Sequence, residues 1–122
     1  MDIQMEETHS LISAEKVDGT SVYGADEDKI GSVKSVMIDK RGGNVAYAVL
    51  SVGGFLGIGE KYHSVPWSKL DYDEKLGGYR LDVTEDQLRD APTFDSKDAR
   101  TAFTRENEQR VYDYYGVPPY WT

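Results

Sequence analysis

The residues Val45-Ala46-Tyr47-Ala48-Val49-Leu50-Ser51-Val52 decide the fold. Nearly every side chain in this stretch is apolar, whereas successive side chains of a β-strand point to opposite faces of its sheet. A strand of this composition must be covered on both faces. The stretch therefore predicts a strand in a barrel wall, covered on the outside by a helix or by a dimer contact.

The preceding stretch, Ile30 to Ile38, has an irregular apolar pattern that one face of a straight strand cannot hold. We expect a β-bulge near Lys34-Ser35, which would shift the phase of the strand and curve it. Small barrels need such curvature. The apolar residues concerned are Ile30, Val33, Val36 and Ile38.

Turn signals separate the apolar runs. Asp18-Gly19, Arg41 to Asn44 and Leu76 to Gly78 contain glycines that suit tight turns. Tyr79 to Val83 alternates cleanly, as in a half-buried strand. Pro66 lacks a backbone N–H and so belongs at an edge or an end of a strand. These features predict a mainly β fold, a small antiparallel barrel.

Helices are predicted after the barrel. Thr84-Glu85-Asp86-Gln87 fits a capping box that starts a short helix, and Pro92 limits that helix to about two turns. A C-terminal amphipathic helix is expected from about Ser96 to Tyr115, with Gly116 as its stop. At helical spacing, its apolar stripe consists of Ala99, Phe103, Asn107, Val111 and Tyr114.

The amino-acid composition excludes several classes of function. Its 122 residues are 39% hydrophobic, enough to bury a core in one domain. The net charge of −8 argues against nucleic acid, whose phosphates need clustered Lys and Arg. Because there is no cysteine, disulfides, thiolate nucleophiles and iron–sulfur clusters are excluded.

The N-terminal residues, Met1 to Glu7, lack the cationic start and the apolar run of a signal peptide. No segment approaches the ~20 apolar residues that cross a bilayer. We therefore expect a cytoplasmic protein that reaches a membrane only through a partner.

Short segments in a fixed order carry a family resemblance, and the glycine-containing block is the most specific of them. The segments are Ser13–Val17, Val22-Tyr23, Lys29–Val33, Ala46–Lys61, Val65–Trp67 and Leu81–Thr84. Over roughly residues 11–94 they resemble the PRC-barrel family. Its members include the cytoplasmic domain of the photosynthetic reaction-centre H subunit and the C-terminal domain of the ribosome maturation factor RimM. The likeness is closest to small stand-alone bacterial members.

This resemblance implies a small β-barrel used as a docking and assembly module, without catalytic residues. We expect an N-terminal arm over residues 1–10, the barrel over residues 11–94, and a helix with an aromatic tail over residues 95–122.

The glycine-rich block does not fit a nucleotide-binding loop, because Glu60 stands where a P-loop needs lysine. It is either a hairpin connection or an interaction loop, in which Phe55, Leu56 and Ile58 would contact a protein.

No metal or cofactor site is expected. His9 and His63 are far apart in the sequence, and His63-Ser64 are neighbours on opposite faces of a strand, so they cannot form a nucleophile–base pair. The acidic cluster at Asp26 to Asp28 departs from the calcium-loop pattern, because Met37 occupies the position that requires glutamate.

Aromatic residues divide into two sets. Trp67 and the tyrosines at 47, 62 and 79 are expected to pack the barrel. The C-terminal set packs either on the chain's own barrel or on a second copy or partner; it comprises Tyr112, Tyr114, Tyr115, Tyr120 and Trp121. The residues that we single out as candidates for protein contacts are Phe55, Leu56, Ile58, Trp67, Phe103, Val111, Tyr114 and Tyr115.

The sequence thus predicts a non-enzymatic adaptor that forms a homodimer and binds a protein partner of unknown identity, with no cofactor. Two alternatives stay open. One is a regulatory subunit of a membrane electron-transfer complex of the H-subunit type, which the resemblance implies. The other is a small-ligand-binding barrel.

Overall fold

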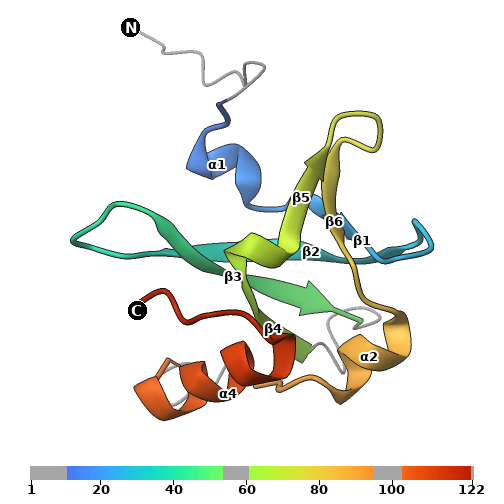
Figure 1. The fold of residues 1–122 in the computed structure, drawn as a ribbon. Helices are drawn as coiled ribbons and strands as arrows, with labels where there is room; N and C mark the ends of the chain where they lie inside the picture. Colours follow the sequence, from blue (N-terminus) through green and yellow to red (C-terminus); the bar gives the residue numbers. More distant parts are fainter. Residues whose placement is uncertain (1–10, 54–60, 95–102, 122) are drawn as a thin grey trace, which may run out of the picture.

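The computed structural model describes residues 11–53, 61–94 and 103–121. These residues form a curled sheet with short helices at its margins (Figure 1). In chain order, the elements of the first half are α1 (Ala14–Val17), β1 (Ser21–Tyr23), β2 (Lys29–Ile38) and β3 (Val45–Val52). Those of the second half are β4 (Lys61–Pro66), the 3-10 turn η1 (Trp67–Lys69), β5 (Leu70–Asp73), β6 (Gly78–Leu81), α2 (Glu85–Asp90) and α4 (Arg105–Tyr115).

The described residues contain one six-stranded sheet with the order β4-β3-β2-β1-β6-β5. Only the three residues of η1 join the edge strand β4 to the opposite edge strand β5, so the two edges approach each other and the sheet curls into a half-barrel. The predicted mainly β barrel with a short helix and a C-terminal helix is confirmed. The expected edge position of Pro66, at the end of β4, is confirmed as well.

One strand pair corrects the prediction of an antiparallel sheet. β1 and β6 run parallel, with Val22 opposite Tyr79, while the other neighbouring strands are antiparallel. The reason is the turn η1, which leads from β4 into β5 across the sheet instead of reversing the chain in a hairpin. The sheet is therefore mixed.

The bulge predicted in β2 is confirmed. Val33 pairs with Leu50 and Ser35 with Val49, so Lys34 is the extra residue. As a result Val33 and Val36 both contact the main core. Ile38 does not follow them, because a second register shift precedes it, and it is 52% exposed.

Two apolar clusters lie on β3, as its composition requires. Ala48 and Leu50 belong to the main core, which fills the inside of the half-barrel together with residues of the other strands. Tyr47 belongs to a second cluster with Ala46 and with Tyr112 of α4. The outer cover of β3 is thus a helix of the same chain.

The helix signals are confirmed in part. Thr84 and Gln87 form the complete capping box of α2, and Gly116 ends α4 with a left-handed φ of 69°. The start predicted near Ser96 is wrong for α4, because the Thr104 hydroxyl caps that helix by accepting from the backbone N–H of Asn107. No helix in the described ranges is long and apolar enough to cross a bilayer.

The apolar stripe predicted for α4 is also wrong, by about a quarter of a turn. Tyr114, on the predicted stripe, is 42% exposed. The buried face has i, i+3, i+4, i+7 spacing, which is a regular helical pattern, but the glutamate at its first position concealed it. That face consists of Glu108, Val111, Tyr112 and Tyr115.

Candidate functional site

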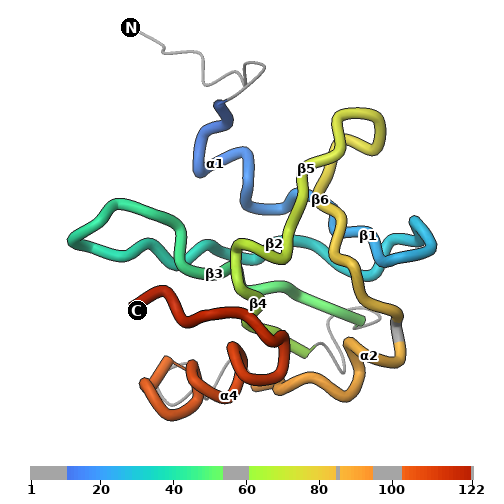
Figure 2. Tube along the Cα trace, viewed as in Figure 1, coloured from blue at the N-terminus to red at the C-terminus, as the bar shows by residue number. Residues whose placement is uncertain are grey.

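A groove of about 720 Å³ lies between the turn that joins β2 to β3 and the C-terminal segment. Figure 2 shows that segment returning from α4 along the sheet. We call this feature the tail groove. Its apolar and aromatic walls are Met37, Ile38, Ala46, Tyr47, Phe103, Tyr120 and Trp121, and its charged residues are Asp39, Lys40, Arg41, Arg105 and Glu108.

Glu108 is the buried charged residue of the tail groove, with 8% of its surface exposed. One carboxylate oxygen accepts a hydrogen bond of 2.7 Å from the Tyr47 hydroxyl, and the other accepts a longer one of 3.5 Å from Tyr120. Burial, and then the hydrogen bond to Glu108, raise the pKa of Tyr47 well above its ordinary value of 10.0. Tyr47 therefore keeps its proton and remains a donor to the carboxylate.

Arg105 holds the tail from the first turn of α4. Its guanidinium carbon lies 3.8 Å from the ring centroid of Trp121 and 5.5 Å from that of Tyr120. Pro118 and Pro119, which precede these rings, restrict the backbone that carries them. The aromatic end of the chain is thus fixed against the groove by stacking and by short, stiff connections.

Replacing Tyr47 by phenylalanine should lower the free energy of unfolding by about 2 kcal/mol, because a buried carboxylate loses its best donor. Tyr115→Phe is the matched control: the Tyr115 hydroxyl is buried and has no hydrogen-bond partner among the described residues. This control should be as stable as the wild type or slightly more stable. Urea unfolding of both variants checks this, and equal losses would contradict the role given to Glu108.

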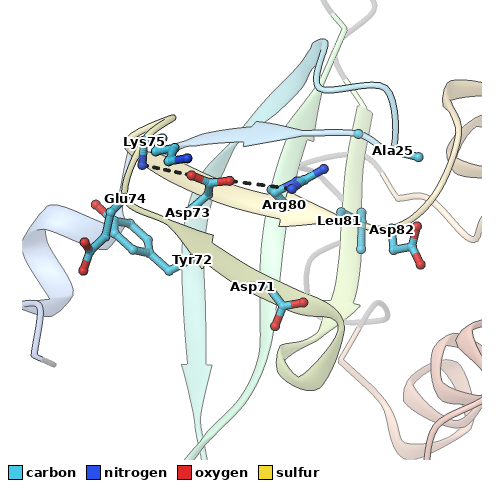
Figure 3. A pocket seen from close by; sticks show the side chains of 10 residues that line it. Ala25, Asp71, Tyr72, Asp73, Glu74, Lys75, Arg80, Leu81 and Asp82 are labelled. Carbon is cyan, nitrogen blue, oxygen red and sulfur yellow. Dashed lines mark hydrogen bonds and ion pairs between the residues drawn. The ribbon is translucent and has the colours of Figure 1, made fainter. Parts of the chain in front are cut away.

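A second pocket, of about 640 Å³, lies at the β5–β6 hairpin (Figure 3). The arginine of this pocket is already paired within the chain: Arg80 lies 3.7 Å from the Asp73 carboxylate and 3.4 Å from that of Glu27. Asp73 also accepts from the backbone N–H of Lys75. No cluster of three metal-ligating side chains occurs in the described part of the chain. The tail groove, with its aromatic walls and buried carboxylate, is the better candidate site.

A family comparison fits this fold. The model of the PRC-barrel domain matches residues 9–88. The chain belongs to the PRC-barrel family. The resemblance drawn from the sequence is thus confirmed, and the match covers all six strands of the half-barrel but ends before α4 and the tail. Most of the tail groove's aromatic wall lies beyond the family domain.

Proteins similar to this PRC-barrel chain include one curated protein and one solved structure. An uncharacterized protein of Deinococcus radiodurans is 27% identical over 93 residues, which make up 76% of this chain and 33% of that protein. The chain thus spans about a third of the length of this curated relative. A solved structure from Pseudomonas aeruginosa, described as the 16S ribosomal RNA processing protein RimM, has 18% identity and a TM-score of 0.41. That similarity covers 69% of this chain and 50% of the other.

The described residues among those predicted for protein contacts do not lie together on one surface. Phe103 lines the tail groove. Val111 and Tyr115 are buried in the chain's own main core, and Trp67 is partly buried against it. Tyr114 is exposed, and its hydroxyl donates to the backbone oxygen of Gln87. The remaining three residues, Phe55, Leu56 and Ile58, lie outside the described residues.

Sequence reasoning missed Glu108, Arg105 and Ile38 as members of one site. Tyr120 and Trp121 stood out as aromatic residues, but their neighbours come from a distant hairpin and a helix. The one available signal was Glu108 itself, which takes the first place in the i, i+3, i+4, i+7 pattern of α4. A charged residue on a buried helix face indicates a site or a buried polar network.

Proposed function

We propose that this PRC-barrel chain is a cytoplasmic, non-enzymatic interaction module that docks a protein partner in the tail groove. The inside of the half-barrel is filled by its own side chains: Val22, Leu50 and Leu81 have no exposed surface. A ligand would therefore bind outside the barrel, where the tail groove lies.

The observation that carries this proposal is the exposure of large apolar side chains at the groove. Ile38 is 52% exposed and Tyr120 is 36% exposed, and both line the same hollow. Tyrosine, tryptophan and arginine are the residues that most often dominate binding energy at protein interfaces. The groove presents all three, through Tyr120, Trp121 and Arg105.

Affinity capture from a lysate of source cells tests the proposal, with the full chain as bait. Ile38→Asp and Tyr120→Ala should each remove specific partners that the wild type retains. Tyr72→Ala is the matched control, because Tyr72 is a similarly exposed tyrosine, at 38%, on β5 beside the other pocket. If the groove variants and the wild type retain the same proteins, the groove is not the docking surface.

The homodimer expected from the sequence is kept as part of this proposal. Light scattering on the wild type and on Ile38→Asp gives their masses in solution. Dimers of both would place self-association outside the tail groove and leave the groove for another partner. A dimer that Ile38→Asp converts to a monomer would identify the partner as a second copy.

A further inference from the structure

We propose that the tail groove receives a basic side chain of its partner, a guanidinium or an ammonium group, with Glu108 as its counter-ion. This rests on the proposed function and names the chemistry that the groove recognises. Glu108 accepts hydrogen bonds from two tyrosine hydroxyls, and it forms no ion pair within the ranges that the structure describes. A buried carboxylate normally has a cationic partner, and here a ligand can supply it.

The walls of the groove suit a cation as well. The face of an aromatic ring is electronegative and attracts Lys and Arg groups within about 6 Å of the centroid. Arg105 shows that the rings of this groove do so, since it already stacks on Trp121 and lies near Tyr120. Phe103 supplies further ring surface in the same hollow.

The charges at the mouth of the groove are mixed. Lys40 and Arg41 are exposed at the turn between β2 and β3, and Asp39 is only partly buried beside them. Arg105, which is exposed and stacks on Trp121, is a third cation, so the lining carries three positive and two negative charges. Solvent and salt screen exposed charges strongly and buried charges much less, so the buried Glu108 is the least screened of the five. The net charge of −8 attracts a basic partner from a distance. Lys40 and Arg41 repel a cationic ligand, so replacing them should strengthen its binding.

The probe is a short capped peptide with one arginine between glycines, titrated into the full chain and followed by NMR. The same peptide with citrulline, a neutral isostere of arginine, should bind about tenfold more weakly. Glu108→Gln should also weaken binding of the arginine peptide about tenfold. The double variant Lys40→Ser/Arg41→Ser should strengthen it by about twofold. Asp71→Asn, in the other pocket, is the matched acidic control and should change nothing.

Because Glu108→Gln alters a buried hydrogen-bonded group, its unfolding in urea is measured alongside. Should that variant not fold, Trp121→Ala carries the test, since it removes ring surface without touching the main core. Tighter binding of a glutamate peptide than of the arginine peptide would overturn the inference, and so would equal affinities for arginine and citrulline. If Ile38→Asp still loses partners in affinity capture while the arginine peptide does not bind, the groove docks a protein but not through a basic side chain.

Discussion

Replacing Gly31 by alanine is expected to lower the free energy of unfolding by about 3 kcal/mol or more. A methyl group at this position of β2 would collide with the backbone oxygen of Ser51 on β3 and press on the side chain of Val52. Backbone in the middle of a sheet cannot move aside cheaply, so the two strands would have to separate. Gly78, whose added carbon would meet the backbone oxygen of Ser21 across the parallel pair, offers a second test.

Gly42→Ala is the matched control for Gly31→Ala. Its added carbon would lie 3.2 Å from a carboxylate oxygen of Asp39 and 3.3 Å from the amide nitrogen of Asn44, both at the ends of side chains. Surface changes of this kind stay within about 0.5 kcal/mol. Urea unfolding measures both variants, and a Gly31→Ala chain that fails to fold meets the expectation. Similar stabilities of the two variants would contradict the close approach of β2 and β3.

Acid is expected to weaken the fold through His63. This residue is 3% exposed on β4, opposite Leu50, and its Nδ1 has no hydrogen-bond partner among the described residues. Burial lowers the pKa of His63 from 6.5 to about 4. Between pH 6.5 and about 4, His63 is therefore protonated in the unfolded chain and neutral in the folded chain. Stability is full above pH 6.5 and falls as the pH drops towards 4, by about 3 kcal/mol from this residue.

The measurement separates the effect of His63 on acid stability from that of the carboxylates, which also titrate in acid. Two proteins are compared, one with His63 and one with His63→Leu. Both carry His9→Gln, so the first has His63 as its one histidine and the second has none. Urea unfolding at roughly pH 7.5, 5.5 and 4.5, from above the ordinary pKa of 6.5 to just above the folded value of about 4, compares the protein that keeps His63 with the His63→Leu variant. The leucine variant should lose less stability between pH 7.5 and 4.5. Parallel pH profiles of the two proteins would show that His63 is not buried in its neutral form.

Much of the fold follows from local patterns. The apolar composition of β3 required cover on both faces, and the structure provides it through Leu50 on one side and Tyr47 on the other. The spacing of Val33 and Val36 required a bulge, and Lys34 supplies it. These features are readable because each one constrains residues that are close together in the sequence.

The parallel pairing of β1 with β6 was not predictable in this way. It joins Val22 to Tyr79, and nothing in either segment specifies the direction of a partner so distant in the sequence. The candidate site was hidden for a similar reason: Glu108 becomes meaningful only when Tyr47 and Tyr120 are placed beside it. The sequence pattern misplaces the face of α4 because a charged residue, Glu108, occupies one of its buried positions.

The extra residue at Lys34 has a consequence for how this chain can change in evolution. Side chains alternate along a strand, so loss of one residue turns every later side chain to the other face. The bulge residue is the exception: without Lys34, the pairs Val33–Leu50, Ser35–Val49 and Val36–Ala48 would form an unbroken ladder. Val36 would stay inside, and β2 would lose only the curvature that the bulge gives. Length changes in β2 should therefore be rare in descendants of this chain, apart from loss of the bulge residue. They should be common in the exposed turn at residues 40–44, where added residues alter no alternation.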